Sequence, residues 1–286
     1  MPELPEVEIT KRSLSKQILL KKVVSVTIIN PKLRYNLNDE KLQDLKGKII
    51  KKIKRRSKYI LVFFDTSNIL LIHLGMTGRF YFVKKNMKKI DTSFYNNKDI
   101  IMKHDHLKIA FEKFELIYND IRKFGFIKKI NKKKVFSNIH LAKLGCEPLS
   151  SKFCPKYLKQ KIFNKKSSIK NLLMNQSIVA GLGNIYVNEV LYLSRINPQK
   201  KGYLLNNNEI RKIINSVKKI IKNAIIAGGS TIANYHNSEG KVGSYQKNFR
   251  VYGRSGLRCQ RSCCKGKIRR IFRSGRSIFY CSKCQT

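Results

Sequence analysis

The sequence Val179-Ala180-Gly181-Leu182-Gly183-Asn184-Ile185-Tyr186 joins two short helical stretches through a glycine-rich turn. On its C-terminal side, apolar residues at helical spacing predict a long helix from Glu209 to Ala227. Asn208 is expected to cap the start of this helix, and Gly228-Gly229 to follow its end. We therefore expect a helical domain over residues 131–250.

The N-terminal part of the chain has the pattern of strands. A helix is expected first, because Pro5 suits a first turn and Glu6 and Glu8 suit the positive end of a helix. Short β-branched and aromatic runs then alternate with turn residues. The expected strands are Val23–Ile29, Tyr59–Phe64, Ile69–Leu74, Arg79–Val83, Leu107–Phe111, Glu115–Tyr118 and Phe126–Ile130. They predict a mostly antiparallel β-sandwich domain over residues 2–130, with a polar loop from Lys84 to Lys103.

The C-terminal tail is rich in cysteine. Cys281 and Cys284 form a Cys-x2-Cys pair, and Cys259 pairs with either Cys263 or Cys264 at zinc-ligand spacing. One structural Zn²⁺ would fold a segment that is too small to have its own core. The Lys and Arg residues between the two pairs predict a β-hairpin that presents cations to DNA. We expect residues 251–286 to be a zinc-finger domain; the alternative is a basic tail with free thiols.

The charge of the chain indicates a polyanionic partner. It has 61 Lys and Arg residues against 17 Asp and Glu, a net charge of +44. Such a surface attracts nucleic acid, because each phosphate that it neutralises releases counterions. Compositional drift in a genome rich in A and T explains part of the lysine excess, and an anionic membrane surface is the weaker alternative partner.

The sequence has no feature of a membrane or exported protein. No apolar run approaches the ~18 residues of a membrane span. The acidic start, broken by Pro2 and Pro5, lacks the basic and apolar regions of a signal peptide. We expect a cytoplasmic, monomeric protein that does not bind membranes.

The N-terminus carries a candidate nucleophile. Pro2 is small enough that removal of Met1 is expected, which exposes a secondary amine with a pKa of about 8. An amine of this kind can attack C1′ of a damaged nucleoside and form a Schiff base, and Glu3 beside it can carry a proton. Taken alone the motif is weak, since most Met-Pro starts are only chain ends.

Several stretches, in order along the chain, together resemble the formamidopyrimidine-DNA glycosylase family. They are Pro2-Glu3-Leu4-Pro5-Glu6-Val7-Glu8, Arg55-Arg56-Ser57-Lys58-Tyr59, His73-Leu74-Gly75-Met76-Thr77-Gly78, Lys103-His104-Asp105-His106, Val179 to Tyr186, Val251-Tyr252-Gly253-Arg254 and Phe279-Tyr280-Cys281. The resemblance implies an α+β fold with an N-terminal antiparallel β-sandwich, a helix–two-turns–helix domain and a C-terminal zinc-finger β-hairpin. It also implies a bifunctional DNA glycosylase and AP lyase of base excision repair, acting on double-stranded DNA that contains oxidised purines.

The resemblance assigns roles to individual residues. Pro2 would be the nucleophile and Glu3 the general acid/base. Lys58 would assist β-elimination or hold a phosphate, and Arg276 would hold the phosphates beside the lesion and assist δ-elimination. Contacts to the damaged strand or its phosphates would come from His104, Arg122, Lys165, Lys170 and Asn184, the last at a helix start where backbone N–H groups are free.

The same resemblance predicts the residues that fill the space left by an extruded base. Met76, Arg122 and Phe124 would form this wedge: a thioether and a ring replace stacking, and the arginine bonds the orphaned base. The alternative is that Met76 and Phe124 are core residues, and that His104 is structural. The segment from Gly228 to Tyr245 would close over the extruded base.

Two departures from the family pattern affect these assignments. Ile121 and Lys123 stand where the family usually has proline and a second arginine, so we expect a looser turn. Ser262 breaks the usual Cys-x2-Cys of the first zinc knuckle; Cys264 keeps the usual separation from Cys281, which favours it over Cys263 as a ligand. A weakened zinc site or a failing enzyme is an alternative.

Two other functions compete with this hypothesis. The first is a glycosylase of the endonuclease VIII branch, which prefers oxidised pyrimidines; Leu4 and the spacing of the tail argue against it. The second is a non-enzymatic, zinc-bearing nucleic-acid-binding protein. Charge and zinc fit that alternative equally well, but the conjunction of Pro2, Glu3, Lys58 and Arg276 within family motifs does not.

Overall fold

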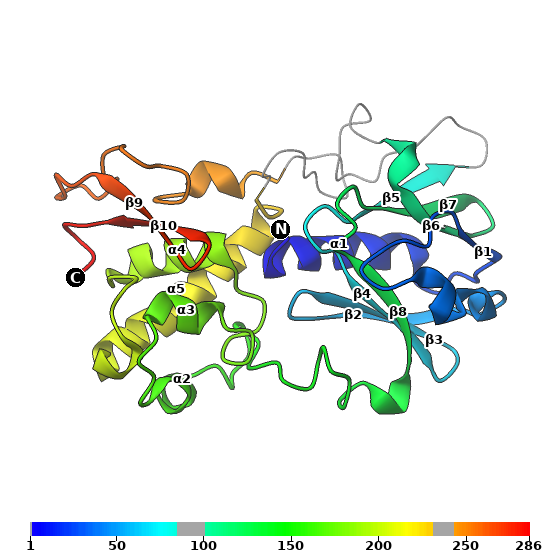
Figure 1. Ribbon diagram of the computed structural model, residues 1–286, viewed down its shortest axis with the longest axis horizontal. Coiled ribbons are helices and arrows are strands. Elements are labelled where there is room, and N and C mark those ends of the chain that lie inside the picture. The colour runs from blue at the N-terminus through cyan, green and yellow to red at the C-terminus, as the bar shows by residue number, and fades with distance from the viewer. Residues whose placement is uncertain (1, 85–100, 231–242) are drawn as a thin grey trace. The chain divides into compact units, whose positions relative to one another are not determined.

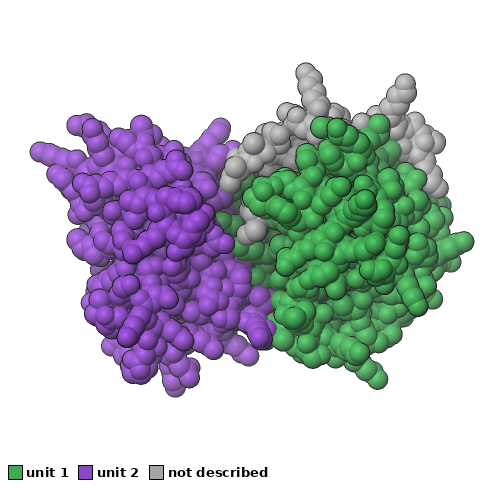
Figure 2. All heavy atoms as spheres, viewed as in Figure 1, with its two compact units in different colours: residues 1–142, 227–244 green, residues 143–226, 245–286 purple. Residues whose placement is uncertain are grey.

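A computed structural model of the protein describes residues 2–84, 101–230 and 243–286 (Figure 1). The chain forms two compact units, residues 1–142 with 227–244 and residues 143–226 with 245–286 (Figure 2). Most of the expected loop from Lys84 to Lys103 lies outside the described residues. None of the helices in the described ranges combines the length and the apolarity that a membrane span requires.

The first unit contains helix α1 (Leu4–Ile18) and two four-stranded antiparallel sheets. One sheet has the order β1 (Ser25–Ile28), β6 (Asp105–Ala110), β7 (Phe114–Asn119), β5 (Arg79–Lys84). The other has the order β2 (Ile50–Arg56), β3 (Tyr59–Phe64), β4 (Asn68–His73), β8 (Phe126–Asn131). Apolar side chains from both sheets and from α1 share one core, so the predicted β-sandwich is confirmed.

Strand β2 was missing from the expected strands. Its sequence is Ile-Lys-Lys-Ile-Lys-Arg-Arg, in which only Ile50 and Ile53 are buried. A β-bulge between Ile50 and Lys52 breaks the period of two on which strand prediction depends. Pairing with β3 forms the strand even though its own sequence gives a weak signal.

The second unit is helical and ends in a β-hairpin. Its helices are α2 (Pro155–Ile162), α3 (Ile169–Met174), α4 (Asn184–Ser194) and α5 (Asn207–Ile226), and the hairpin pairs β9 (Ile268–Arg273) with β10 (Arg276–Cys281). Short 3-10 helices in the described parts of the chain span Leu37–Glu40, Leu42–Leu45, Met102–His104, Lys132–Lys134, Gly202–Leu204 and Tyr245–Asn248.

Helix α5 begins at Asn207, two residues earlier than expected. Asn206 and Glu209 form a capping box: Glu209 N–H donates to Asn206 Oδ1 at 2.9 Å, and Asn206 N–H donates to Glu209 Oε2 at 3.0 Å. The prediction that Asn208 caps this helix is therefore wrong, because Asn208 lies inside the first turn. Gly228 and Gly229 follow the helix end with positive φ, as expected.

Glu189 of α4 fixes the segment that leads into the hairpin. Its carboxylate is 1% exposed and accepts the backbone N–H groups of Arg250, Val251 and Tyr252 at 2.8, 3.0 and 2.8 Å. Burial raises the pKa of Glu189 despite these bonds. Val251 joins a small core around the hairpin with Tyr192, Cys259, Ile268, Phe279 and Cys281.

His73 makes the stability of the first unit depend on pH. Burial, followed by the charge of Lys58, lowers its pKa to about 4. The ring stacks on Phe126 with centroids 5.6 Å apart, and its Nδ1 accepts the N–H of Gly75 at 3.1 Å. An unfolded histidine titrates near pH 6.5. Between pH 6.5 and 4 the unfolded state therefore binds more protons, and the free energy of unfolding falls as the pH falls.

Between pH 7 and pH 5, His73 is expected to remove about 2 kcal/mol of the free energy of unfolding. Urea denaturation at the two pH values measures this loss, and His73→Gln should lose correspondingly less on acidification than the unsubstituted protein. An equal loss in both proteins would show that His73 does not titrate in this way.

Candidate active site

Pro2 and Glu3 lie buried at the N-terminal end of α1. Glu3 is the N-cap residue and forms a reciprocal capping box with Glu6, whose Oε2 accepts the N–H of Glu3 at 2.9 Å. The other oxygen of Glu6 accepts both the N–H and the Oγ–H of Ser230, at 2.8 and 2.9 Å. Two buried carboxylates thus stand next to Pro2. The sequence indicated Glu6 only as a residue that suits the positive end of the helix, although the Glu3-x-x-Glu6 spacing is also that of a capping box.

Lys58 occupies a tight turn between β2 and β3. Arg56 pairs with Tyr59, so Ser57 and Lys58 alone form the loop, and Ser57 has φ +56°. Lys58 is buried. It therefore follows a basic strand and precedes an apolar one, as the sequence predicts.

Arg55 connects this turn to α1. Its Nη1 donates to the carbonyl of Ser57 at 2.9 Å and its Nε donates to Glu8 Oε2 at 3.0 Å. Although burial opposes ionisation of Glu8, the charges of Lys11 and Arg55 hold the pKa of this carboxyl below its usual value. The Lys58 turn is thus held to the same helix that begins at Leu4, two residues after Pro2.

Met76, Arg122 and Phe124 lie in two neighbouring loops of the first unit. Met76 is 39% exposed and Phe124 is 49% exposed, so the alternative that they are core residues is wrong. The Arg122 guanidinium lies 4.8 Å from the centroid of the Phe124 ring, within the range of a cation–π contact.

Asp120 joins these two loops. Its carboxylate is 0% exposed and accepts the hydroxyl of Thr77 at 2.5 Å, the N–H of Gly125 at 2.8 Å and the N–H of Arg122 at 3.3 Å. The Thr77 Oγ1 in turn accepts the N–H of Arg122 at 3.0 Å. These bonds hold the turn in which Ile121 replaces the expected proline.

The two loops also touch through their backbones. A Cβ on Gly75 would lie 2.4 Å from the N of Gly125, and Gly75 has φ +61°, so only glycine fits. His104 is half-buried beside this region, and its carbonyl accepts the N–H of Asp120 at 3.0 Å. Thr77 and Asp120 were missed as positioning residues in the sequence.

In the second unit, Lys170, Asn184 and the start of β10 come together. Lys170 Nζ and Asn184 Nδ2 both donate to the carbonyl of Ser277, at 3.0 and 3.1 Å. Burial, followed by the charge of Arg276, lowers the pKa of Lys170 to about 8. Asn184 Oδ1 is buried and has no hydrogen-bond donor within the described ranges.

Arg276 is exposed at the first position of β10, next to this group. A hollow of about 270 Å³ adjoins it, lined by Lys170, Asn171, Met174, Asn175, Arg273, Ser274 and Arg276. Three cations and no acidic side chain line the hollow, so it suits an anion. Lys165 is exposed in the turn after α2 and is not part of this group.

Four cysteines converge at the far end of the hairpin. The Sγ atoms of Cys259, Cys264, Cys281 and Cys284 all lie within 4.8 Å of one another and can hold a metal ion. Cys263 is exposed and is not part of the cluster. The spacing from Cys259 left open whether Cys263 or Cys264 belongs to the cluster, and the structure places Cys264 in it. A Cβ on Gly266 would lie 2.7 Å from the Sγ of Cys281, so glycine is required there for close packing.

Comparison with known proteins identifies the family. Residues 1–127 match the formamidopyrimidine-DNA glycosylase N-terminal domain, and residues 144–236 match the formamidopyrimidine-DNA glycosylase H2TH domain. The chain is 38% identical over 296 residues to the formamidopyrimidine-DNA glycosylase of Bartonella quintana, with 100% of both chains covered.

Two solved structures of the Lactococcus lactis protein are also similar, each 34% identical with a TM-score of 0.86. One is a complex with DNA that contains N7-benzyl-Fapy-dG, matched over 100% of both chains. The other is a complex with abasic-site DNA, matched over 99% of both chains. The chain belongs to the formamidopyrimidine-DNA glycosylase family.

Asp120 provides a test of the loop arrangement. Asp120→Asn replaces an acceptor oxygen with an NH₂ group, so at least one bond to the two loops is lost and the free energy of unfolding should fall by about 2 kcal/mol. Hydrogen exchange at the amides of Arg122 and Gly125 should accelerate. The exposed Asp39→Asn serves as the matched control and should change neither measurement; unchanged exchange in Asp120→Asn would mean that other contacts hold the loops.

Proposed function

We propose that this protein is a bifunctional DNA glycosylase and AP lyase that removes oxidised purines from double-stranded DNA in base excision repair. The observation that carries the proposal is the buried N-terminus, where Glu3 and Glu6 stand next to Pro2, in a chain that matches its family along its whole length. The Lactococcus lactis structures, which hold DNA that contains N7-benzyl-Fapy-dG or an abasic site, support the same class of substrate.

The chemistry begins after removal of Met1, a residue outside the described ranges. The free amine of Pro2 attacks C1′ of the damaged nucleotide, and the glycosidic C–N bond breaks with its electron pair leaving on the base. Glu3 carries protons between the amine, the sugar and the departing base. The C1′–O4′ bond of the sugar ring then breaks, O4′ takes a proton, and the nitrogen lone pair of Pro2 forms the double bond, so the product is a ring-opened Schiff base between Pro2 and C1′.

Strand cleavage follows from this Schiff base. Loss of a proton from C2′ expels the 3′ phosphate, and a second elimination expels the 5′ phosphate; water then releases the sugar fragment from Pro2. We assign assistance of the first elimination to Lys58 and of the second to Arg276, which would also hold the flanking phosphates. The burial of Lys58 and the anion-sized hollow beside Arg276 support these roles.

The remaining contacts bind and open the duplex. We assign phosphate or strand contacts to His104, Lys165, Lys170 and Asn184, the last at the start of α4, where the helix dipole is positive. Met76, Arg122 and Phe124 would fill the space of the extruded base, and their exposure supports this role. The segment proposed to cover that base includes residues 231–242, which lie outside the described residues.

One structural zinc ion is proposed for the cysteine cluster. Four thiolates at a Zn–S distance of about 2.3 Å lie about 3.8 Å apart in a tetrahedron. The Cys259–Cys284 and Cys264–Cys281 Sγ distances are 3.8 and 3.6 Å, which fits this ion. Zinc here would hold the hairpin that carries Arg276.

Zinc content is expected to be one equivalent per chain, with Cys264 and not Cys263 as the fourth ligand. Cys264→Ser should therefore lose the metal and DNA binding, while Cys263→Ser should retain both. Mass spectrometry under native conditions measures the metal. Zinc loss in Cys263→Ser with retention in Cys264→Ser would reverse the assignment.

The nucleophile is tested by borohydride trapping on a duplex with 8-oxoguanine opposite cytosine. We expect a covalent adduct in the wild type, intact mass without Met1, and loss of most trapping and base release in Pro2→Gly. Active protein that retains Met1 in full would exclude Pro2. A protein that binds the duplex but gives no adduct would instead be the non-enzymatic alternative.

The same assay, run as a competition among lesions, tests the substrate. Arg122 donates well to the acceptors of cytosine and poorly to adenine, so 8-oxoguanine opposite adenine should be excised more slowly. Thymine glycol should be a minor substrate. A clear preference for thymine glycol over 8-oxoguanine opposite cytosine would place the protein in the endonuclease VIII branch.

A further inference from the structure

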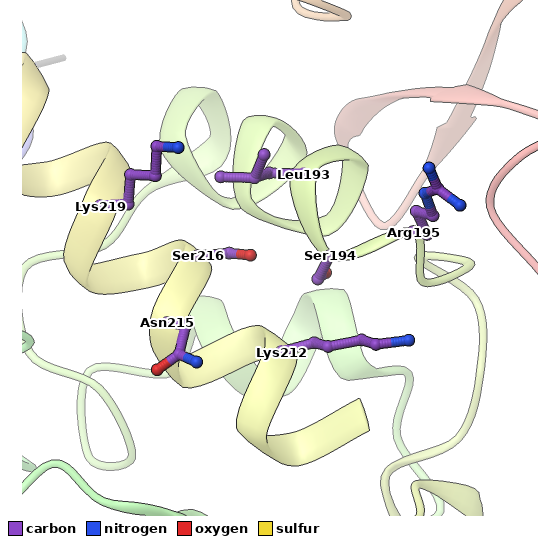
Figure 3. Close-up of a pocket in the computed structure, with 7 residues that line it drawn as sticks. All are labelled: Leu193, Ser194, Arg195, Lys212, Asn215, Ser216 and Lys219. Atoms are coloured by element: carbon purple, nitrogen blue, oxygen red, sulfur yellow. The ribbon is translucent and has the colours of Figure 1, made fainter. Parts of the chain in front are cut away.

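A second basic hollow lies in the helical unit, apart from the group around Arg276. It has a volume of about 450 Å³ and is formed by the C-terminal end of α4 and one face of α5 (Figure 3). Arg195 caps the end of α4, whereas Asn184 begins that helix. At 1.5 Å per residue the two positions lie roughly 16 Å apart along the helix, so the hollow is not an extension of the Asn184 site.

The hollow has a positive charge that no described neighbour neutralises. Arg195, Lys212 and Lys219 line it, and none of its lining residues is acidic. None of these three cations forms an ion pair with a residue that the structure describes. By contrast Lys200, close to the start of α5, pairs with Glu209 at 2.6 Å. A concave surface with three uncompensated cations attracts an anion.

Ser216 adds a polar group aimed into the hollow. It is 6% exposed, and no hydrogen bond of its hydroxyl to a described residue is found. Figure 3 shows this hydroxyl pointing from α5 toward α4. The neighbouring Ser194 differs, because its hydroxyl donates to the Val190 carbonyl at 2.9 Å. A hydroxyl that borders the hollow and has no bond to another described residue can donate to a ligand oxygen.

The spacing of the cations indicates an extended ligand. Lys212 and Lys219 are seven residues apart on the same face of α5, roughly 10 Å along the helix axis, a separation that more than one phosphate of a DNA strand can span. Successive phosphates of one strand match this row.

We propose that this hollow is a second anion site that binds the phosphodiester backbone of a nucleic-acid segment other than the one held by the Arg276 group. Arg195, Lys212 and Lys219 neutralise successive phosphates, and Ser216 donates to a phosphate oxygen. Occupation of this site keeps the protein attached to DNA when the first site is filled or released. The site does not depend on the glycosylase chemistry.

The test fills the first site before the second is measured. The protein is saturated with a duplex that contains a tetrahydrofuran abasic-site analogue, and a labelled, unmodified single-stranded oligonucleotide is then titrated. The pocket variant is Arg195→Gln/Lys212→Gln/Lys219→Gln. Its matched control is Arg211→Gln/Lys218→Gln/Lys222→Gln, which removes the same charge from α5 outside the hollow. A third arm titrates inorganic triphosphate, the free source of the same chemistry.

The wild type and the control should bind the oligonucleotide, and the pocket variant should bind it at least tenfold more weakly. The slope of log affinity against log salt should fall by about 2 in the pocket variant, from three lost contacts at ~0.7 each. Ser216→Ala should weaken binding about threefold. All variants should keep wild-type borohydride trapping, which separates this site from the proposed catalytic activity.

Equal loss of oligonucleotide binding in the pocket variant and the control would overturn the proposal, because general charge would then explain the binding. Binding of triphosphate without binding of the oligonucleotide would overturn the assignment to nucleic acid. Absence of trapping in the wild type would count against the catalytic proposal alone and would leave the second-site measurement valid.

Discussion

Buried carboxylates that accept backbone N–H groups hold this structure in place. The chain has only 17 acidic residues against 61 basic ones, yet Glu6, Asp120 and Glu189 are almost fully buried. Burying an ionised carboxylate is costly unless charge-assisted hydrogen bonds compensate for the lost water. Each of the three accepts hydrogen bonds from at least two backbone N–H groups. These bonds fix irregular segments, which have no helix or sheet hydrogen bonds to order them.

The burial of these carboxylates also affects the charge of the protein surface. Carboxylates that bind backbone N–H groups inside the fold do not pair with lysine and arginine on the surface. The cations near Arg276 and those of the α4–α5 hollow therefore keep their full attraction for phosphate. Every lysine adds to the net charge whether or not it contacts DNA, which is why total charge alone does not locate a site.

Local pattern predicted most of the fold, and long-range pairing explains the rest. Seven strands of the sandwich and α5 follow from periodicity and turn residues, α1 from Pro5 and its acidic first turn, and the C-terminal hairpin from the basic residues between the cysteine pairs. Strand β2 was not predicted, because a β-bulge interrupts its alternation. The N-cap of α5 is Asn206, whereas the nearby Asn208 was predicted. The motifs indicated Pro2, Lys58 and the cysteines as candidate site residues. They did not reveal Asp120 as a link, since Thr77 is 43 residues away in the chain. Nor did they separate Lys212 and Lys219 from other lysines, because only the packing of α4 creates the hollow.

The hydrogen bonds between Glu189 and residues 250–252 limit how the cysteine-rich tail can be transferred to another protein. Many small zinc-bound segments are portable: they can be cut from one protein and fused to another with their fold intact. Here the first residues of the tail depend on a carboxylate of α4, and its small core includes Tyr192 of the same helix. A fragment that starts at residue 251 would lose both. Transfer of this tail to another protein would therefore require α4 as well.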